Sequence, residues 1–224
     1  MDVIAPSMRE LAVHWLGTVP YVEGLERQHA LVEDRRAGRV PDTLLLLEHP
    51  HVITLGVKRE AARSHVQATP DELEARGVDV VEAGRGGDVT YHGPGQLVAY
   101  PVIELGTDRR DVHRYVRDLE EVMIRTCARF GVAAGRIAGL SGAWVGDRKI
   151  GAVGVRISRW ITSHGIALNV ATRLDYFDLI VPCGIQDKGV TSLARETGRD
   201  LAVTDVLAPL AEAFAAVFER TLAS

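Results

Sequence analysis

The stretch from Gly84 to Tyr100, GRGGDVTYHGPGQLVAY, is the part of the sequence that decides the fold. Five glycines and one proline in so short a span disfavour one continuous strand, whereas β-forming residues stand on both sides of the Gly-Pro-Gly interruption. The pattern predicts two extended segments between residues 88 and 103, joined by a glycine-rich corner. Bare backbone also lets amide N–H groups approach a bound carbonyl or phosphate, with Arg85 and His92 as further ligand partners. A plain hairpin with glycine bends is the alternative, and it explains the glycines but not these two side chains.

Outward from this stretch, predicted helices and strands mix without a regular β-α-β order. Strands are expected near residues 11–16, 43–47 and 78–81, and helices near 20–38, 69–76, 112–130 and 206–222. Thr69 and Glu72 have the spacing of a capping box with Pro70 between them, and a hairpin is expected about Gly146-Asp147. The absence of internal repeats and linkers favours the α+β class, with a single domain.

The composition narrows the class of protein. A chain of 224 residues fits one domain, and a net charge of -4 argues against a general nucleic-acid binder. Without an apolar leader or a long apolar run, we expect no export signal and no membrane span. Two cysteines supply neither a disulfide framework nor a recognisable zinc site, so we expect no metal, no cofactor and a cytoplasmic location.

The two cysteines have different surroundings in the sequence. Cys127 lies on the apolar face of the predicted helix 112–130, which favours a structural role. Cys183 stands between Pro182 and Gly184 in VPCGI, so it is expected in a loop and is the candidate nucleophile. A reactive thiol needs a neighbour that stabilises the thiolate. Candidates for that neighbour are His49, His51, His92, His164, Lys149 and Lys188, and the residues alone do not choose among them.

Two further stretches are rich in glycine. RKIGAVGVRI (148–157) places Gly151 and Gly154 in a predicted strand, where a bulge or a close ligand usually explains them. Lys149 precedes these glycines, and a solvated lysine at a strand end is the alternative to a functional one. SHGIALNV (163–170) could line an acyl tunnel or fill the core. P-loop, G-x-S-x-G and G-x-G-x-x-G motifs are all missing, and a metal site at His49 and His51 lacks further ligands.

Taken together, these stretches resemble the lipoyl(octanoyl) transferase family. The pattern R-G-G-x-x-T-aromatic-H-x-x-G-Q is met by Arg85, Gly86, Gly87, Thr90, Tyr91, His92, Gly95 and Gln96. KIGAVG, HGIALN and PCGI follow in the same order as in the family. The resemblance covers nearly the whole chain. It implies the fold of the biotin and lipoate protein ligases, a mixed-sheet α+β catalytic domain over residues 1–224.

The resemblance also implies a reaction and its site. Cys183 would take octanoate from octanoyl-acyl carrier protein as a thioester, and Lys149 would lower the pKa of its thiol. The acceptors would be lysines of lipoyl domains, in the acyltransferase subunits of 2-oxoacid dehydrogenases and in the glycine cleavage H protein. The residues expected to contact the acyl substrate are Arg85, Gly86, Gly87, Asp88, Val89, Thr90, Tyr91, His92, Ala152, Val153, Gly154, Gly165, Ile166 and Ala167.

Three other functions are compatible with the same fold. An ATP-dependent lipoate-protein ligase would activate free acid and need no cysteine, and a lipoyl amidotransferase would use a differently placed cysteine. A binding module would hold its partners without turnover. Because acyl carrier protein is typically acidic, we also expect a basic patch, for which Arg148, Arg159 and Lys188 are candidates.

Overall fold

The computed structural model describes residues 9–57, 59–181 and 188–223. Helices and strands mix along this part of the chain, and the strands form two sheets of mixed direction. The predicted α+β class with a mixed sheet is therefore confirmed. No helix in the described ranges is long and apolar enough to cross a membrane.

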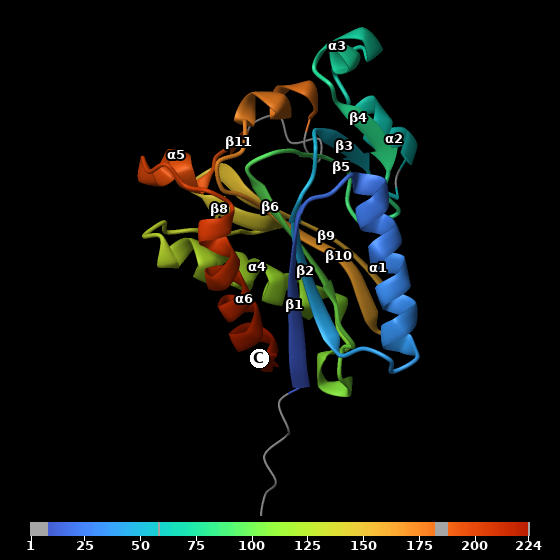
Figure 1. The fold of residues 1–224 in the computed structure, drawn as a ribbon. Coiled ribbons are helices and arrows are strands. Elements are labelled where there is room, and N and C mark those ends of the chain that lie inside the picture. The colour runs from blue at the N-terminus through green and yellow to red at the C-terminus, as the bar shows by residue number, and fades with distance from the viewer. Residues whose placement is uncertain (1–8, 58, 182–187, 224) are drawn as a thin grey trace, which may run out of the picture.

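The larger sheet runs through the centre of the molecule (Figure 1). Its strands are, in spatial order, β12 (Arg220–Leu222), β1 (Arg9–Thr18), β2 (Asp42–Glu48), β6 (Gln96–Val102), β10 (Ile161–Asn169), β9 (Arg148–Ser158), β8 (Leu140–Val145) and β7 (Gly135–Ile137). Strand β1 is parallel to both of its neighbours, and the short strand β11 (Gly189–Val190) is parallel to β9. The pairings from β2 to β7 are antiparallel.

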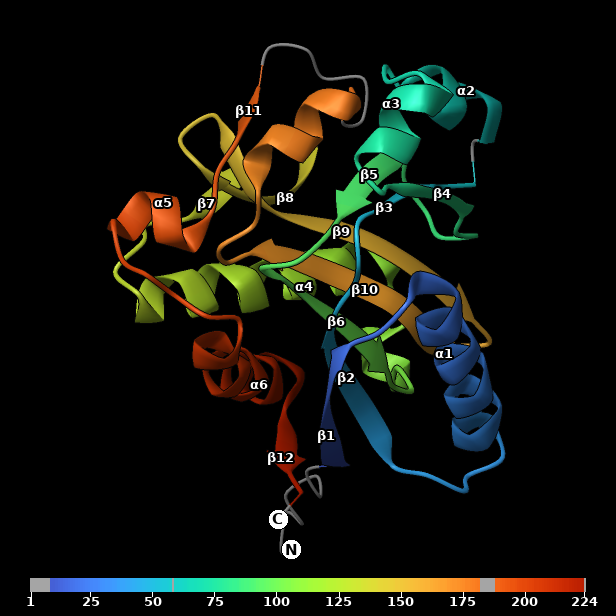
Figure 2. The same cartoon turned by 45° about the horizontal axis from the view of Figure 1, so that its top comes forward.

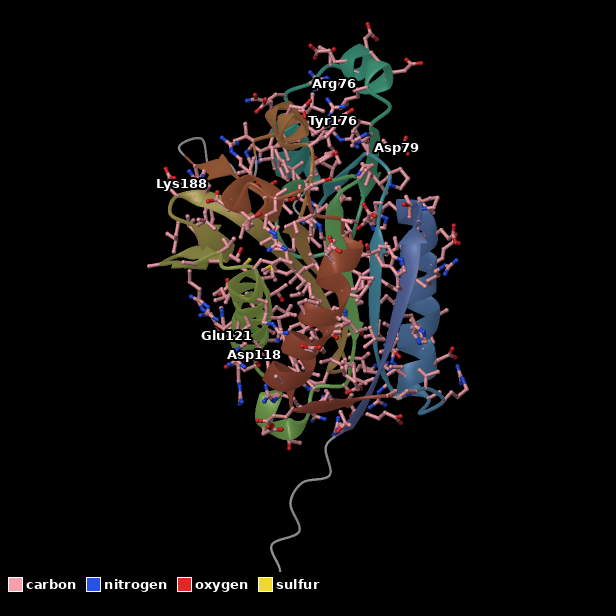
Figure 3. The ribbon with its side chains drawn as sticks, turned by 60° about the vertical axis from the view of Figure 1, so that its left-hand side comes forward. Arg76, Asp79, Asp118, Glu121, Tyr176 and Lys188 are labelled. Carbon is pink, nitrogen blue, oxygen red and sulfur yellow. The ribbon has the colours of Figure 1, made fainter. Side chains whose placement is uncertain are left out.

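The smaller sheet stands above one end of the larger one (Figure 1). It consists of β4 (Asp79–Glu82), β3 (Val52–Leu55) and β5 (Val89–His92), and it packs with α2 (Arg59–Ser64), α3 (Pro70–Ala75) and η2 (Leu174–Leu179). Thr69 begins α3 with both hydrogen bonds of a capping box, as predicted. Tyr176 of η2 lies beside Arg76, whose guanidinium carbon is 5.7 Å from the ring centroid (Figure 3). The glycine-rich stretch therefore joins two sheets, because β5 belongs to the small sheet and β6 to the large one.

One face of the large sheet is covered by α4 (Val112–Arg129) and α6 (Thr204–Phe218), as Figure 2 shows. The Asp111 carboxylate begins α4 by accepting the backbone N–H groups of His113 and Arg114. The main apolar core lies between these helices and the sheet, and it includes Leu44, Leu46, Leu97, Ala99, Leu119, Met123, Ile166, Leu168, Leu210, Phe214 and Phe218. Cys127 belongs to this core, where burial raises the pKa of its thiol to about 12, so its structural role is confirmed.

The opposite face is covered by α1 (Tyr21–Arg36) (Figure 2). The sequence predicts this helix but suggests an apolar face made by Tyr21, Leu25 and Val32. The positions that are buried are Tyr21, Gly24 and Gln28. Gly24 is needed because a Cβ there would lie 3.1 Å from Cε1 of His49. The inner face of α1 thus meets polar rings as well as a small apolar cluster that includes Leu45, Leu47 and Val98.

Buried charges hold the edge of the large sheet where β1, β2 and β12 meet. Asp42, at the start of β2, accepts hydrogen bonds from Nε of Arg35 at 2.8 Å and from Nε of Arg220 at 2.9 Å. Arg220 begins β12, 178 residues later in the chain. The side chains of Asp42 and Arg220 are only 1% and 7% exposed. Removing one partner of such a buried pair typically costs about 3–5 kcal/mol.

The last helix ends earlier than its apolar pattern predicts. Glu219 adopts the left-handed conformation, with φ of 54°, and ends α6 so that the chain turns into β12. The prediction that Leu222 lies in the helix is therefore wrong. Pro209 lies inside α6. Two short helical segments complete the described chain, η1 (Thr107–Arg109) and α5 (Leu193–Thr197).

Candidate active site

A pocket opens between α1, strand β5 and the surface formed by β6, β9 and β10. Its walls come from segments far apart in the sequence: Tyr21, Arg85, Gly87, Asp88, Val89, Thr90, His92, Gln96, Val98, Tyr100, Ser141, Lys149, Gly151, Ala152, Val153, Gly154, His164, Gly165, Ile166, Ala167, Asn169, Phe177 and Val190. All three glycine-rich stretches of the sequence contribute to it. Of the site residues predicted within the described ranges, only Gly86 and Tyr91 do not line it.

Gly86 and Tyr91 lie beside the pocket for different reasons. The backbone N–H of Gly86 donates to the carbonyl of Val155 at 2.9 Å, which ties the glycine-rich loop to β9. Tyr91 is fully buried in the small-sheet core, because residues 90 and 92 of β5 face the pocket and residue 91 faces the other way. Its hydroxyl and Nδ1 of His51 are 2.7 Å apart.

Arg85 is buried along the pocket wall. Its guanidinium donates hydrogen bonds to the backbone carbonyl and to Oγ1 of Thr54, at 2.9 and 2.8 Å, and to the carbonyl of Gly86 at 3.1 Å. A Cβ on Gly154 would lie 2.8 Å from Cδ of Arg85. Gly154 therefore gives the arginine side chain the room to lie against β9. A close side chain, rather than a bulge, explains this strand glycine.

A chain of buried hydrogen bonds fixes the ring of His92. Its Nδ1 lies 2.7 Å from Oε1 of Gln96, whose Nε2 donates to Oδ1 of Asn169 at 3.0 Å. Asn169 in turn donates to the carbonyl of Thr191, whose own N–H donates to the carbonyl of Lys149. Because this series of hydrogen bonds ends on backbone carbonyl oxygens, which only accept, each earlier member must donate toward them. Nδ1 of His92 therefore carries the proton and Nε2 is an acceptor. Burial lowers the pKa of His92 to about 3, so this ring is neutral at pH 7.

Two more buried histidines lie near His92. Nδ1 of His49 donates to the carbonyl of Val19 at 2.6 Å, and the Tyr100 hydroxyl donates to its Nε2 at 2.8 Å. His164 is 2% exposed and lines the pocket. Burial lowers the pKa of both His49 and His164 to about 4. All three rings are therefore uncharged at neutral pH, which suits a pocket for an uncharged ligand.

Lys149, near the start of β9, provides a cationic side chain in the pocket wall. Its Nζ lies 4.7 Å from the centroid of the Trp144 ring, a cation-π contact with the neighbouring strand β8. On its other side, β11 pairs Val190 with Lys149. The sequence pattern left a solvated strand-end lysine as the alternative, and the half-buried side chain lining a pocket does not fit that alternative.

Cys183 lies outside the described residues, but the segments on both sides of it are placed. The N–H of Val181 donates to the carbonyl of His65 at 2.8 Å, and Nδ1 of His65 lies 2.7 Å from Oδ2 of Asp88. On the other side, Val190 pairs with Lys149. Val181 is two residues before Cys183, and it reaches the pocket residue Asp88 only through His65, whereas Val190 lines the pocket itself.

The predicted basic patch is not compact. Lys188 directly precedes Gly189, which pairs with Arg148 at the beginning of β9. Arg159 follows the other end of this strand, about 35 Å away at roughly 3.3 Å per residue. Arg159 therefore cannot share one patch with Arg148 and Lys188. Arg148 is also paired with Glu196, at 2.9 Å.

Several pocket residues carry no motif signal and were not predicted. Tyr21, Tyr100 and Phe177 look like ordinary core aromatics in the sequence, and Gln28 behind the pocket looks like a solvent-facing helix residue. His164 was considered only as one of several histidines. Among the described residues, no group of three or more His, Cys, Asp or Glu side chains could hold a metal ion.

The arrangement combines an ammonium group, neutral imidazoles and exposed glycine backbone around a partly apolar channel. Val98 and Ala167, whose side chains lie on the α1 face of the sheet, supply apolar wall. Such a site can hold an uncharged acyl chain and stabilise negative charge at one end. These are the features that acyl transfer requires.

Comparison with known proteins identifies the class of catalytic domain to which this chain belongs. The family model of the lipoyl protein ligase A/B catalytic domain matches residues 20–215. A solved structure of the bi-partite lipoate protein ligase and its E2 lipoyl domain from Thermoplasma acidophilum has a TM-score of 0.70 and 16% identity, covering 97% of this chain and 88% of that one. That likeness concerns the fold, which is the one expected from the sequence. The chain is therefore a lipoyl protein ligase A/B catalytic domain.

Closer relatives give the particular family. The octanoyltransferase of Myxococcus xanthus is 50% identical over 218 residues, which is 95% of this chain and 60% of that relative. The octanoyltransferase of Chloroflexus aurantiacus (strain ATCC 29366 / DSM 635 / J-10-fl) is 53% identical over 215 residues, which is 93% of this chain and 96% of that relative. The chain belongs to the octanoyltransferase family and is an acyltransferase enzyme.

Proposed function

We propose that the enzyme moves an octanoyl group from octanoyl-acyl carrier protein to the lysine of a lipoyl domain, through a thioester on Cys183 supported by Lys149. The observation that carries this proposal is the position of Lys149 in a pocket walled by the three glycine-rich stretches. The flanking residues also support it, because Val190 lines the pocket beside Lys149 and Val181 is bound to His65, whose ring contacts the pocket residue Asp88.

The first step exchanges one thioester for another. The Cys183 thiolate attacks the carbonyl carbon of the carrier thioester, a new C–S bond forms, and the C–S bond to the carrier breaks. The carrier thiolate leaves with a proton from the ammonium of Lys149, which becomes neutral. The ammonium of Lys149 favours the thiolate of Cys183 by charge pairing, and the two groups titrate as a coupled pair. Because both thioesters have similar energy, this step needs no ATP.

The second step forms the amide. The ε-amine of the acceptor lysine attacks the acyl-enzyme, a C–N bond forms, and the C–S bond to Cys183 breaks. The proton lost by the amine passes to neutral Lys149 and then to the leaving thiolate. In this proposal, the pocket-lining members of residues 85–92, 152–154 and 165–167 contact the acyl substrate, whereas Gly86 and Tyr91 support the wall from behind. Glycine N–H groups in these segments stabilise the oxyanion, where one such donor is typically worth about 10²–10³ in rate.

The proposal includes the partners and the setting. The acceptors are the lipoyl domains of 2-oxoacid dehydrogenase acyltransferase subunits and of the glycine cleavage H protein. The family match over residues 20–215 supports one catalytic domain spanning residues 1–224. The chain has 2 cysteines, and this sparse use suits a reducing compartment, which supports a cytoplasmic location.

Intact mass spectrometry tests the acyl-enzyme. The protein is mixed with octanoyl-acyl carrier protein in the absence of an acceptor, and one octanoyl group is expected on Cys183. The Cys183→Ser variant should gain none, whereas Cys127→Ala should be loaded like the parent because Cys127 is buried in the core. Loading that survives Cys183→Ser would refute the proposed nucleophile. Turnover of free octanoate with ATP in that variant would instead identify a ligase.

Alkylation kinetics test the role of Lys149. With Lys149→Ala, reaction of Cys183 with iodoacetamide at neutral pH should slow about tenfold or more, since one unit of thiol pKa is tenfold in thiolate. Lys188→Ala is the matched control, because Lys188 is a lysine close to the same strand. Equal rates in Lys149→Ala and the parent would contradict the cysteine-lysine pair. Comparing acyl carrier protein with octanoylated H protein as donor separates the transferase from an amidotransferase.

A further inference from the structure

His164 has a backbone conformation that its position does not explain. Its φ is 55°, in the left-handed region, although it lies inside β10 and is fully buried. The other non-glycine residues with positive φ in the described chain are Arg159 and Trp160 in the β9–β10 turn and Glu219 at the end of α6. Turns and helix ends ordinarily accept a positive φ. Inside a strand it costs about 1–3 kcal/mol and persists only where surrounding contacts impose it.

The contact that holds this conformation comes from α1. The backbone N–H of His164 donates to Oε1 of Gln28 at 2.6 Å, across 136 residues of sequence. Gln28 is itself buried, and its Nε2 lies 3.3 Å from the carbonyl of Gly24. A buried glutamine on the inner face of a helix is therefore used to fix the backbone of His164.

The result is a ring placed in the pocket wall. The imidazole meets the Tyr100 ring edge-on, with centroids 6.1 Å apart and planes at 87°, and Tyr100 is held in turn by His49. Among the residues that the structure describes, Nδ1 of His164 is buried without a hydrogen-bond partner. The place of the ring is thus set by its backbone and by packing rather than by a polar contact of Nδ1. Burial keeps the ring neutral at pH 7, with a pKa of about 4, so it can border an alkyl chain.

His164 lies at the opposite end of the pocket from Lys149. His164 pairs with Val155 of β9, and Val155 is six residues from Lys149 on the same strand. The positions of His164 and Lys149 along the strand are therefore about 20 Å apart, at roughly 3.3 Å per residue. An extended octanoyl thioester measures about 11 Å from its sulfur to its last carbon, since each carbon-carbon bond of about 1.5 Å advances the chain by about 1.3 Å. Contact with the ring begins about 4 Å before its own level. Octanoyl therefore fits in the remaining span of about 16 Å, dodecanoyl, at about 16 Å, fills it, and tetradecanoyl, at about 18 Å, does not fit.

We propose that His164, held by Gln28, is the end wall that limits the length of the acyl chain. This inference rests on the proposed function, which puts the acyl carbonyl at the Lys149 end. Gln28 acts as a positioning residue, and the wall excludes long chains by contact without taking part in the chemistry.

The test uses the full chain with a series of acyl carrier thioesters from hexanoyl to tetradecanoyl, in competition, with transfer to a lipoyl domain read by mass spectrometry. His164→Gly removes the ring and suits a positive φ. It should raise the tetradecanoyl-to-octanoyl ratio about tenfold or more, as expected for methylenes admitted to an apolar site. Gln28→Leu should shift the ratio in the same direction. His29→Ala, an exposed neighbour on α1, should leave it unchanged.

The outcomes separate this inference from the proposed function. Thermal shifts with octanoate and tetradecanoate measure chain selectivity without turnover. If the parent transfers no acyl group but His164→Gly gains tetradecanoate binding, the proposed function is refuted and the role of His164 as end wall is supported. If the parent transfers octanoate and His164→Gly keeps the parental ratio, the wall is refuted. Should the glycine variant fail to fold, as seen by circular dichroism, His164→Asn is read in the same way, because asparagine tolerates this conformation.

Discussion

The two faces of the large sheet are built from the same strands but differ in chemistry. On β2 and β6, Leu44, Leu46, Leu97 and Ala99 point to α4 and α6, whereas the intervening residues Leu45, Leu47, Val98 and Tyr100 point to α1. The first face is closed by an apolar core. The second carries buried histidines and tyrosines and opens into the pocket.

The difference shows how stability and function are divided in this molecule. Helix α4 contributes Leu119, Val122 and Met123 to a continuous core. Helix α1 contributes Tyr21, Gly24 and Gln28, which contact polar groups of the pocket. We therefore expect substitutions on the α4 side to change unfolding free energy, and substitutions on the α1 side to act more on pH dependence and substrate selection.

The largest effect is expected on the core face. Phe214→Ala removes a fully buried ring that stacks on Phe218, with centroids 4.3 Å apart. We expect a loss of about 3–5 kcal/mol of unfolding free energy, measured by urea denaturation. Octanoyl transfer per folded molecule should remain close to that of the parent. A large loss of activity in the folded variant would contradict the hypothesis that the core face serves stability and the pocket face serves function.

The second effect is the loss of unfolding free energy on acidification, which comes from the buried histidines of the pocket face. The pKa values of His49, His92 and His164 are about 4, 3 and 4, below the ordinary value of 6.5. Below pH 6.5 the unfolded chain binds protons that the native chain does not, so stability falls as pH drops toward 4. Between pH 6.5 and 5 the loss is up to about 2 kcal/mol for each histidine.

Urea denaturation at pH 7 and pH 5 measures this dependence. His49→Gln should remove part of it by removing one of the three titrating groups. His14, an exposed histidine on β1, is the control, and His14→Gln should leave the dependence intact. A His49 variant with the parental dependence would show that this ring is not held neutral by burial.

The smallest effect comes from a matched pair of hydroxyl deletions. Tyr100→Phe on the pocket face leaves Nε2 of His49 buried without its donor, at a cost of about 1–2 kcal/mol. Tyr115→Phe on the core face removes a buried hydroxyl that makes no well-aligned hydrogen bond within the described residues, so its stability should be unchanged or slightly raised. Thermal melts of both variants measure the difference. Equal losses would mean that the two faces treat polar groups alike.

Much of the fold follows from local patterns in the sequence. The capping box at Thr69, the apolar spacing of α4 and the hairpin at Gly146-Asp147 depend on residues close together in the chain, and all three are confirmed. The buried face of α1 and the early end of α6 were not predicted. Both depend on distant partners, because Gly24 packs on His49 and β12 pairs with β1.

The candidate site divides in the same way. The glycine-rich stretches point to the pocket because bare backbone in a strand is unusual, and the resemblance to a family assigns Lys149 its role. Tyr21, Tyr100 and His164 give no such signal, since their importance comes from contacts across large sequence separations. The role of Cys183 stays a prediction, because the residue lies outside the described ranges.

The pairing of Asp42 with Arg220 has a consequence during synthesis. A ribosome that adds about 5–20 residues per second needs about ten to forty seconds to make the 178 residues between them. During that interval the Asp42 carboxylate, which is buried in the folded protein, can pair with Arg35 but not yet with Arg220. Strands β1 and β2 can associate early, but the edge of the sheet is complete only after β12 has been synthesised and pairs with β1. Protein made slowly or stalled before that point should therefore be the form most exposed to chaperones and proteases.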